Sequence, residues 1–155
     1  MKASLQKTTL TLSLFSLFCW GVTSQTQFLK CVSKSLVGIH YLLVIKTNHI
    51  KRGDIVSIQW HDIPYVKRNL LAKRFVGLPG DKVIRKAKAI HVNSQTFPFL
   101  KATRKGEPLT PLSTTTIPKG YVFVAGDHSR SFDSRYEEFG LVPLEKVWGR
   151  AVLWW

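Results

Sequence analysis

The chain of 155 residues has the length of one domain with a short additional segment. Apolar residues make up 45% of it, which is typical of a globular protein and excludes an intrinsically disordered one. The formal net charge is +14, and sixteen Lys and Arg residues stand against three acidic residues between positions 30 and 105. This charge favours anionic partners, namely lipid headgroups, nucleic acid or an acidic protein.

The N-terminal segment, residues 1–29, carries no charge apart from Lys2 and Lys7, which precede an apolar run at residues 10–22. The run is shorter than the roughly 20 residues that cross a bilayer. Its uncharged flanks are nevertheless long enough for a transmembrane helix with a cytoplasmic N-terminus. The alternative is a signal peptide that is removed, leaving a chain that starts at Gln25.

Residues 30–155 are predicted to form a single all-β domain. Short β-branched and aromatic runs alternate there with Gly, Pro and Asn turns, and no helical period is evident. The predicted strands are Tyr41–Lys46, Ile55–Trp60, Leu70–Val76, Lys82–Lys86, Ala89–Val92, Tyr121–Ala125 and Val147–Trp155. Gln27–Val37 is predicted to be extended, and residues 101–118, rich in Thr, Pro and Lys, to form an excursion between strands.

A dense polar stretch, GDHSRSFDSRY, follows the strand that ends at Ala125. Each of its polar groups needs a partner if the loop is buried. A solvated loop with an Asp133–Arg135 ion pair is the simplest interpretation of the stretch by itself. A catalytic triad of His128, Asp133 and a serine is disfavoured, because the first two share one short loop.

Lys73 lies in an apolar strand, where burial would lower the pKa of its amine. A free lysine is deprotonated only about one time in a thousand at neutral pH, so such a shift is needed before the amine can act as a base. Arg74 points to the opposite face of a strand and cannot release its proton usefully. The alternative is an ordinary surface Lys–Arg pair.

Three segments in this order resemble the motif set of type I signal peptidases: SKSL at Ser33–Leu36, KRFVGLPGDKV at Lys73–Val83, and the polar stretch at Gly126–Tyr136. The short chain and the sequence SFDSRY within the polar stretch are most similar to the conjugative-transfer (TraF-type) branch of this family, which processes pilin precursors. The resemblance implies an antiparallel β-sheet domain with an N-terminal transmembrane helix. It also implies a serine endopeptidase, anchored by a single span in the cell inner membrane with its domain on the periplasmic side, that removes leader peptides from exported or pilin-like precursors.

The resemblance implies that Ser35 is the nucleophile and Lys73 its general base. Ser33 then corresponds to a second serine, whose hydroxyl joins the Ser35 backbone N–H in an oxyanion hole. The alternative register makes Ser33 the nucleophile. The family has a proline shortly after the serine, whereas Val37 stands here. This departure leaves open a catalytically inactive relative, a basic scaffold domain in a secretion or conjugation assembly.

Three further residues carry supporting roles by the same resemblance. The Ser131 hydroxyl is expected to form a hydrogen bond with the Lys73 amine and so to orient it. A hydroxyl can do this without favouring the protonated, charged form of the amine. Asp133 and Arg135 are expected to brace the loop as a pair. A carboxylate in direct contact with the amine would instead raise its pKa.

No cofactor or metal is expected, because the two cysteines and five histidines show no ligand spacing. The expected partners are the leader peptides of precursor proteins and, from the charge and the N-terminal segment, anionic membrane lipids. Nucleic acid is not expected, since the basic region lacks interleaved aromatic residues at recognisable spacing. A nucleic-acid-binding β-barrel nevertheless remains a rival that salt-dependent DNA binding would reveal.

Overall fold

The computed structural model describes residues 13, 16, 20–21, 23–60, 63–66 and 70–155. Eleven β-strands and one 3-10 helix make up the described elements. They are β1 (Thr26–Lys30), β2 (Tyr41–Lys46), β3 (Ile55–Gln59), β4 (Leu70–Gly77), β5 (Lys82–Lys86), β6 (Ala89–Val92), β7 (Gln95–Pro98), β8 (Thr115–Thr116), β9 (Tyr121–Ala125), β10 (Val142–Pro143), η1 (Leu144–Lys146) and β11 (Val147–Trp154).

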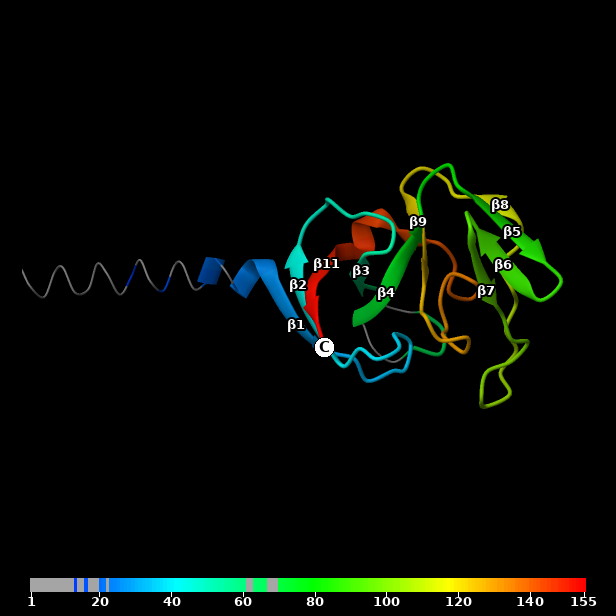
Figure 1. Ribbon diagram of the computed structural model, residues 1–155, viewed down its shortest axis with the longest axis horizontal. Coiled ribbons are helices and arrows are strands. Elements are labelled where there is room, and N and C mark those ends of the chain that lie inside the picture. The colour runs from blue at the N-terminus through cyan, green and yellow to red at the C-terminus, as the bar shows by residue number, and fades with distance from the viewer. Residues whose placement is uncertain (1–12, 14–15, 17–19, 22, 61–62, 67–69) are drawn as a thin grey trace, which may run out of the picture.

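The strands form two sheets in which every pairing is antiparallel. The larger sheet has the order β1-β2-β11-β3-β4-β9-β10, so the C-terminal strand β11 lies between β2 and β3. The smaller sheet, β7-β6-β5-β8, lies beyond β9 at the other end of the domain (Figure 1). Its strands all come from the part of the chain between β4 and β9, and β8 lies within the excursion at residues 101–118.

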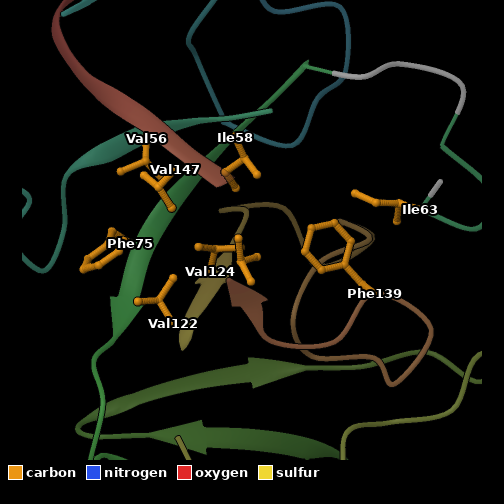
Figure 2. Packing of buried hydrophobic residues seen from close by; sticks show 9 residues of the cluster. Val56, Ile58, Ile63, Phe75, Val122, Val124, Phe139 and Val147 are labelled. Carbon is orange, nitrogen blue, oxygen red and sulfur yellow. The ribbon is translucent and has the colours of Figure 1, made fainter. Parts of the chain in front are cut away.

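Alternation along the strands places one set of side chains in a common core (Figure 2). Val56 and Ile58 of β3 face Phe75 of β4 and Val124 of β9. Phe139, from the chain beyond the polar stretch, closes the same cluster. Each of these side chains is almost fully buried, so the cluster holds the central strands in register.

A second cluster joins the two sheets. Val76 of β4 and Phe123 of β9 pack against Val83, Ile90 and Val92 of the smaller sheet. The smaller sheet is thereby packed against β4 and against β9, the strand that precedes the polar stretch. This contact determines the position of the smaller sheet.

The turn after β4, in the segment Gly77–Asp81, is held by Asp81. Its carboxylate accepts the Leu78 N–H at 2.7 Å and pairs with the Arg52 guanidinium. That guanidinium is the largest cause that holds the Asp81 pKa well below its usual range. The ion pair connects the loop before β3 to the end of β4.

The all-β prediction for the domain is confirmed, and each of the seven predicted strands is present within one residue of its predicted bounds. The extended prediction for Gln27–Val37 is wrong beyond Lys30, because the chain leaves β1 and forms successive turns. Gly38, with φ +74°, lies at the end of these turns. Strands β7, β8 and β10 were not predicted, since two- and four-residue runs containing Thr and Pro carry little periodicity.

The predicted membrane helix lies mostly outside the described residues. Within the part of the chain that the structure describes, no helix combines the length and the apolar character needed to cross a membrane.

Candidate active site

Three separate segments meet at one end of β4. β4 pairs with β3 from Leu70 to Arg74, but it pairs with β9 only from Arg74 onward. Lys73 therefore lies where the β9 ladder stops, and the polar stretch begins directly after β9. The turns after β1 bring Ser35 to the same place. Ser35 and Ser131, which are 38 and 58 positions from Lys73 in the sequence, can therefore both reach its amine.

The Lys73 amine forms a closed triangle with two serine hydroxyls. Its Nζ lies 2.6 Å from Ser35 Oγ and 2.7 Å from Ser131 Oγ, and the two oxygens lie 2.7 Å apart. All three residues are buried, with 5% of Lys73 and 8% of Ser35 exposed. At these distances a proton can pass between the amine and the Ser35 hydroxyl.

Burial lowers the pKa of Lys73 to about 8 from its ordinary value near 10.5. Desolvation is the largest cause; the Asp133 charge opposes it and the Arg135 charge adds to it. The predicted alternation holds, because the Arg74 side chain on the other face of β4 remains 38% exposed.

The Asp133 carboxylate is occupied by partners other than the amine. Its oxygens accept Arg135 Nε–H at 2.7 Å and the Gly126 N–H at 2.8 Å, and both residues of the ion pair are buried. Arg135 also donates to the Gly126 carbonyl at 3.0 Å. The ion pair thus links the polar stretch to the backbone of Gly126, at its own start. The Asp133 charge raises the pKa of Lys73 and the Arg135 charge lowers it.

Gly126 leaves the space that the hydroxyl triangle fills. A Cβ at this position would overlap both Ser131 Oγ and Ser35 Oγ. Only a residue without a side chain therefore permits the two hydroxyls to approach each other beneath the Lys73 amine. The Gly-Asp pair predicts a turn at Gly126 but not this role, because one of the two hydroxyls comes from a remote segment.

The segment that carries Ser35 is held from several sides. Leu36 packs in a third buried cluster with Leu42 of β2. The Ser35 carbonyl accepts the His128 N–H at 3.2 Å, and the N–H of Val37 donates to Asp127 at 3.3 Å. These contacts locate the segment in a chain that lacks the expected proline.

Asp127 is itself held by β4. Arg74 donates to it through Nε at 2.5 Å and through Nη2 at 3.2 Å. The two neighbours on β4 thus have separate partners: Lys73 contacts the Ser35 hydroxyl, and Arg74 is linked through Asp127 to the Val37 backbone N–H. No sequence pattern predicts a role for Asp127 or Arg74, although both lie within the motif segments.

Ser33 and His128 lie beside the triangle but outside it. Ser33 is exposed and lines the adjoining cleft. His128 accepts the Arg130 N–H through Nδ1 at 3.0 Å, and its described contacts do not include Asp133. Among the described contacts, the Lys73 amine therefore reaches Ser35 and not Ser33, and His128 and Asp133 do not form a triad.

A cleft of about 1400 Å³ opens beside the triangle. Its walls include the Ser33–Leu36 segment, the Leu70–Lys73 half of β4, and Phe132. This half of β4 faces the cleft with the edge that β9 does not cover, and no described strand pairs with that edge. In the described part of the chain, no group of three His, Cys, Asp or Glu side chains could hold a metal ion.

The comparisons with known proteins agree with the motifs. The family described as "Signal peptidase, peptidase S26" matches residues 3–155. Signal peptidase I of Bacillus licheniformis is 36% identical over 120 residues, which cover 72% of this chain and 62% of that protein. Signal peptidase I V of Bacillus subtilis (strain 168) is 34% identical over 125 residues, 70% of each chain.

Two further matches extend the comparison. The chloroplastic thylakoidal processing peptidase 1 of Arabidopsis thaliana is 30% identical over 108 residues, 66% of this chain and 29% of that protein. A crystal structure of a signal peptidase I from Enterococcus faecalis V583 is 30% identical, with a TM-score of 0.43 over 65% of this chain and 95% of that one. The matched region spans 62% and 64% of the length of the Bacillus licheniformis protein and of signal peptidase I P from Bacillus subtilis subsp. natto.

Proposed function

The chain belongs to the signal peptidase S26 family, and from this premise we propose that it is a serine endopeptidase that removes signal or leader peptides from precursor proteins. One observation carries the proposal: a buried amine with a lowered pKa lies within hydrogen-bond distance of a serine hydroxyl beside a cleft. That combination supplies a nucleophile and a base where a polypeptide can bind.

In the proposed reaction, neutral Lys73 takes the proton from Ser35 Oγ as this oxygen attacks the scissile carbonyl carbon. The protonated amine then returns a proton to the departing amine, and the C–N bond breaks to leave an acyl-enzyme. A water molecule, deprotonated by the same amine, attacks the ester carbonyl carbon; the C–O bond to Ser35 then breaks, the amine returns the proton to Ser35 Oγ, and the product leaves with a free carboxyl group. Each half-reaction thus returns Lys73 to the neutral form.

Ser131 has the proposed role of orienting the amine. Its hydroxyl lies 2.7 Å from Nζ, so it limits the directions in which the Lys73 lone pair can point. The oxyanion is proposed to bind the Ser35 backbone N–H and the Ser33 hydroxyl. Asp133 and Arg135 are proposed to maintain the loop without touching the reacting atoms.

The substrate is proposed to bind as an extended strand along the free edge of Leu70–Lys73. An exposed strand edge offers unpaired N–H and C=O groups, and main-chain pairing of this kind provides affinity with little dependence on sequence. The cleft beside it is larger than the 300–1,000 Å³ of a usual small-molecule pocket, which suits a peptide.

We also propose the finer points of the family resemblance: a single N-terminal span in the cell inner membrane, a periplasmic domain, and pilin-like precursors among the substrates. The charge pattern of residues 1–29 supports the orientation. N-terminal sequencing of the protein recovered from membranes tests the anchor, because a start at Gln25 would show that the segment is removed.

The alternative is an inactive scaffold domain, which the absence of the family's proline favours. The test is cleavage of a purified precursor in detergent by the wild type and by Ser35→Ala and Lys73→Ala. We expect both variants to lose at least about 10³-fold in rate, whereas Ser94→Ala and Lys82→Ala, at exposed sites, retain wild-type rates. Absence of cleavage by the folded wild type would support the scaffold instead.

A further inference from the structure

We propose that the cleft selects precursors that carry acidic side chains close to the cleavage site. This inference rests on the proposed endopeptidase function and adds a substrate class to it. It concerns the charged residues that line the cleft around the hydroxyl triangle but do not take part in the reaction.

Cations from three parts of the chain converge on this cleft. Its lining includes Lys30 and Lys34 near the nucleophile, Arg104 and Lys105 from the excursion, and Arg130 from the polar stretch. All five are exposed. Among the described lining residues the one acid is Glu107, whose carboxylate accepts the Thr103 hydroxyl at 2.9 Å.

These five cations differ from the paired arginines elsewhere in the molecule. Within the described residues, none of the five forms an ion pair with a carboxylate, whereas Arg52, Arg74 and Arg135 each do. Like charges gathered around a hollow repel one another, and walls of low dielectric strengthen their field. An anionic group in the cleft relieves that repulsion, so binding of an acidic segment is favoured over a neutral one.

The excursion that carries Arg104 and Lys105 is hydrogen-bonded to the polar stretch and to the two glutamates directly after it. Glu137 accepts the Ser113 hydroxyl at 2.7 Å, and Glu138 accepts the Thr110 N–H at 2.7 Å. Leu112 N–H also donates to the carbonyl of Arg135 at 2.9 Å.

The two glutamates that separate Tyr136 from Phe139 therefore serve as anchors for this segment. Their attachment keeps the basic end of the excursion beside the cleft, so Arg104 and Lys105 can meet a bound substrate without a large movement of the chain.

The probes are internally quenched peptides of one sequence, with small residues before the cut and Asp, Asn or Lys at the flanking positions on both sides. Asn matches the shape of Asp without its charge. We expect kcat/KM to be about fivefold higher for the Asp peptide than for the Asn peptide at low ionic strength, and lowest for the Lys peptide. The ratio should approach one at 0.5 M salt, because ions screen exposed charges.

The matched variants are Arg104→Gln with Lys105→Gln, and Lys86→Gln with Lys88→Gln at the β5–β6 turn outside the cleft lining. The first pair should reduce the Asp-to-Asn ratio at least twofold, and the second should leave it unchanged. Equal rates for Asp and Asn peptides with the wild type would overturn the inference, as would equal effects of the two double variants.

A binding measurement tests this inference independently of the proposed endopeptidase function. Fluorescence anisotropy with the Ser35→Ala variant measures the affinity for the same peptides without any cleavage. If the wild type cuts none of them, the endopeptidase proposal fails, while tighter binding of the Asp peptide still supports the acidic preference. Equal binding of all three peptides overturns the preference even if cleavage is observed.

Discussion

Lys73 illustrates at the level of one residue how burial lowers the pKa of an amine. Its amine is bonded only to hydroxyls among its described side-chain partners, and the nearby carboxylate of Asp133 is held by Arg135 and by the backbone. A hydroxyl can accept from the charged amine and donate to the neutral one, so it accommodates both proton states. Direct contact with a carboxylate would favour the charged form and remove the base.

The pKa of about 8 predicts the pH dependence of cleavage. Because the neutral amine is the active form, kcat/KM should rise with pH, about tenfold per unit below pH 7, and level off above pH 9. The measurement is kcat/KM for one uncharged peptide between pH 5.5 and 10. A rate that is already level below pH 6.5 would contradict a role for the Lys73 amine as the base.

Gly126→Ala should abolish cleavage while the domain remains folded. The new methyl group would overlap the hydroxyls of Ser35 and Ser131, so at least one must leave the triangle. We expect kcat to fall at least about 100-fold, because misplacement by about 1 Å costs that much. Circular dichroism provides the check on folding, and Gly21→Ala, where no atom lies within 4 Å of the added Cβ and φ is not positive, provides the comparison for cleavage.

At the scale of the element, the Ser35 segment depends on neighbours from β4 and from the polar stretch. Regular strand pairing does not hold it, since it lies in turns between β1 and β2. Leu36 and Ile39 anchor it in a buried cluster, while Asp127 and His128 hold its backbone. The proline of the family restricts the backbone directly, and here contacts between segments have that effect.

Asp127→Ala should reduce kcat about tenfold and change KM less, because it removes the acceptor of the Val37 N–H and the partner of Arg74. Asp127→Asn retains an oxygen acceptor and should have a smaller effect. The measurement is steady-state cleavage of one peptide by the three proteins. Equal losses for both variants would indicate that the ion pair, and not the contact to Val37, positions the segment.

At the scale of the whole molecule, the fold must bury a lysine and still remain stable. Three apolar clusters, one within the large sheet, one between the two sheets and one beneath the Ser35 segment, supply the burial. A charged amine in this interior opposes folding, and the opposition depends on pH.

Lys73→Met should alter the pH dependence of stability. Below pH 8 wild-type Lys73 is charged in both states, and its burial costs about 3 kcal/mol relative to the unfolded chain. Between pH 8 and about 10.4 the unfolded state binds more protons, so this contribution makes wild-type stability rise with pH. Urea unfolding should therefore show the Met variant gaining most over the wild type at pH 7 and losing this advantage by pH 10.5.

Lys82→Met, at an exposed position of β5, should show no such trend. Parallel curves for the wild type and Lys73→Met from pH 7 to pH 10.5 would mean that the folded-state amine keeps its ordinary pKa, and the proposed base would lose its physical foundation.

The sequence by itself determined the main strands and indicated the candidate residues of the site. β-branched runs between Gly and Pro turns predict β2, β3, β4 and β9, because backbone preference and alternation act locally. Lys73 was separable from Arg74 by the same alternation. The prediction extended Gln27–Val37 too far, because the packing of Leu36 and Ile39 in turns carries no periodic signal.

Only the tertiary structure decided which serine contacts the Lys73 amine, that Asp127 links Val37 to Arg74, and that Glu137 and Glu138 anchor the excursion. Ser33 and Ser35 are two positions apart, and the resemblance, although it implies Ser35, leaves both registers open. The choice depends on which hydroxyl reaches an amine 38 positions away. Such distances are set by how β4, β9 and the Ser35 segment pack, and packing between remote segments is a property that no local pattern of residues encodes.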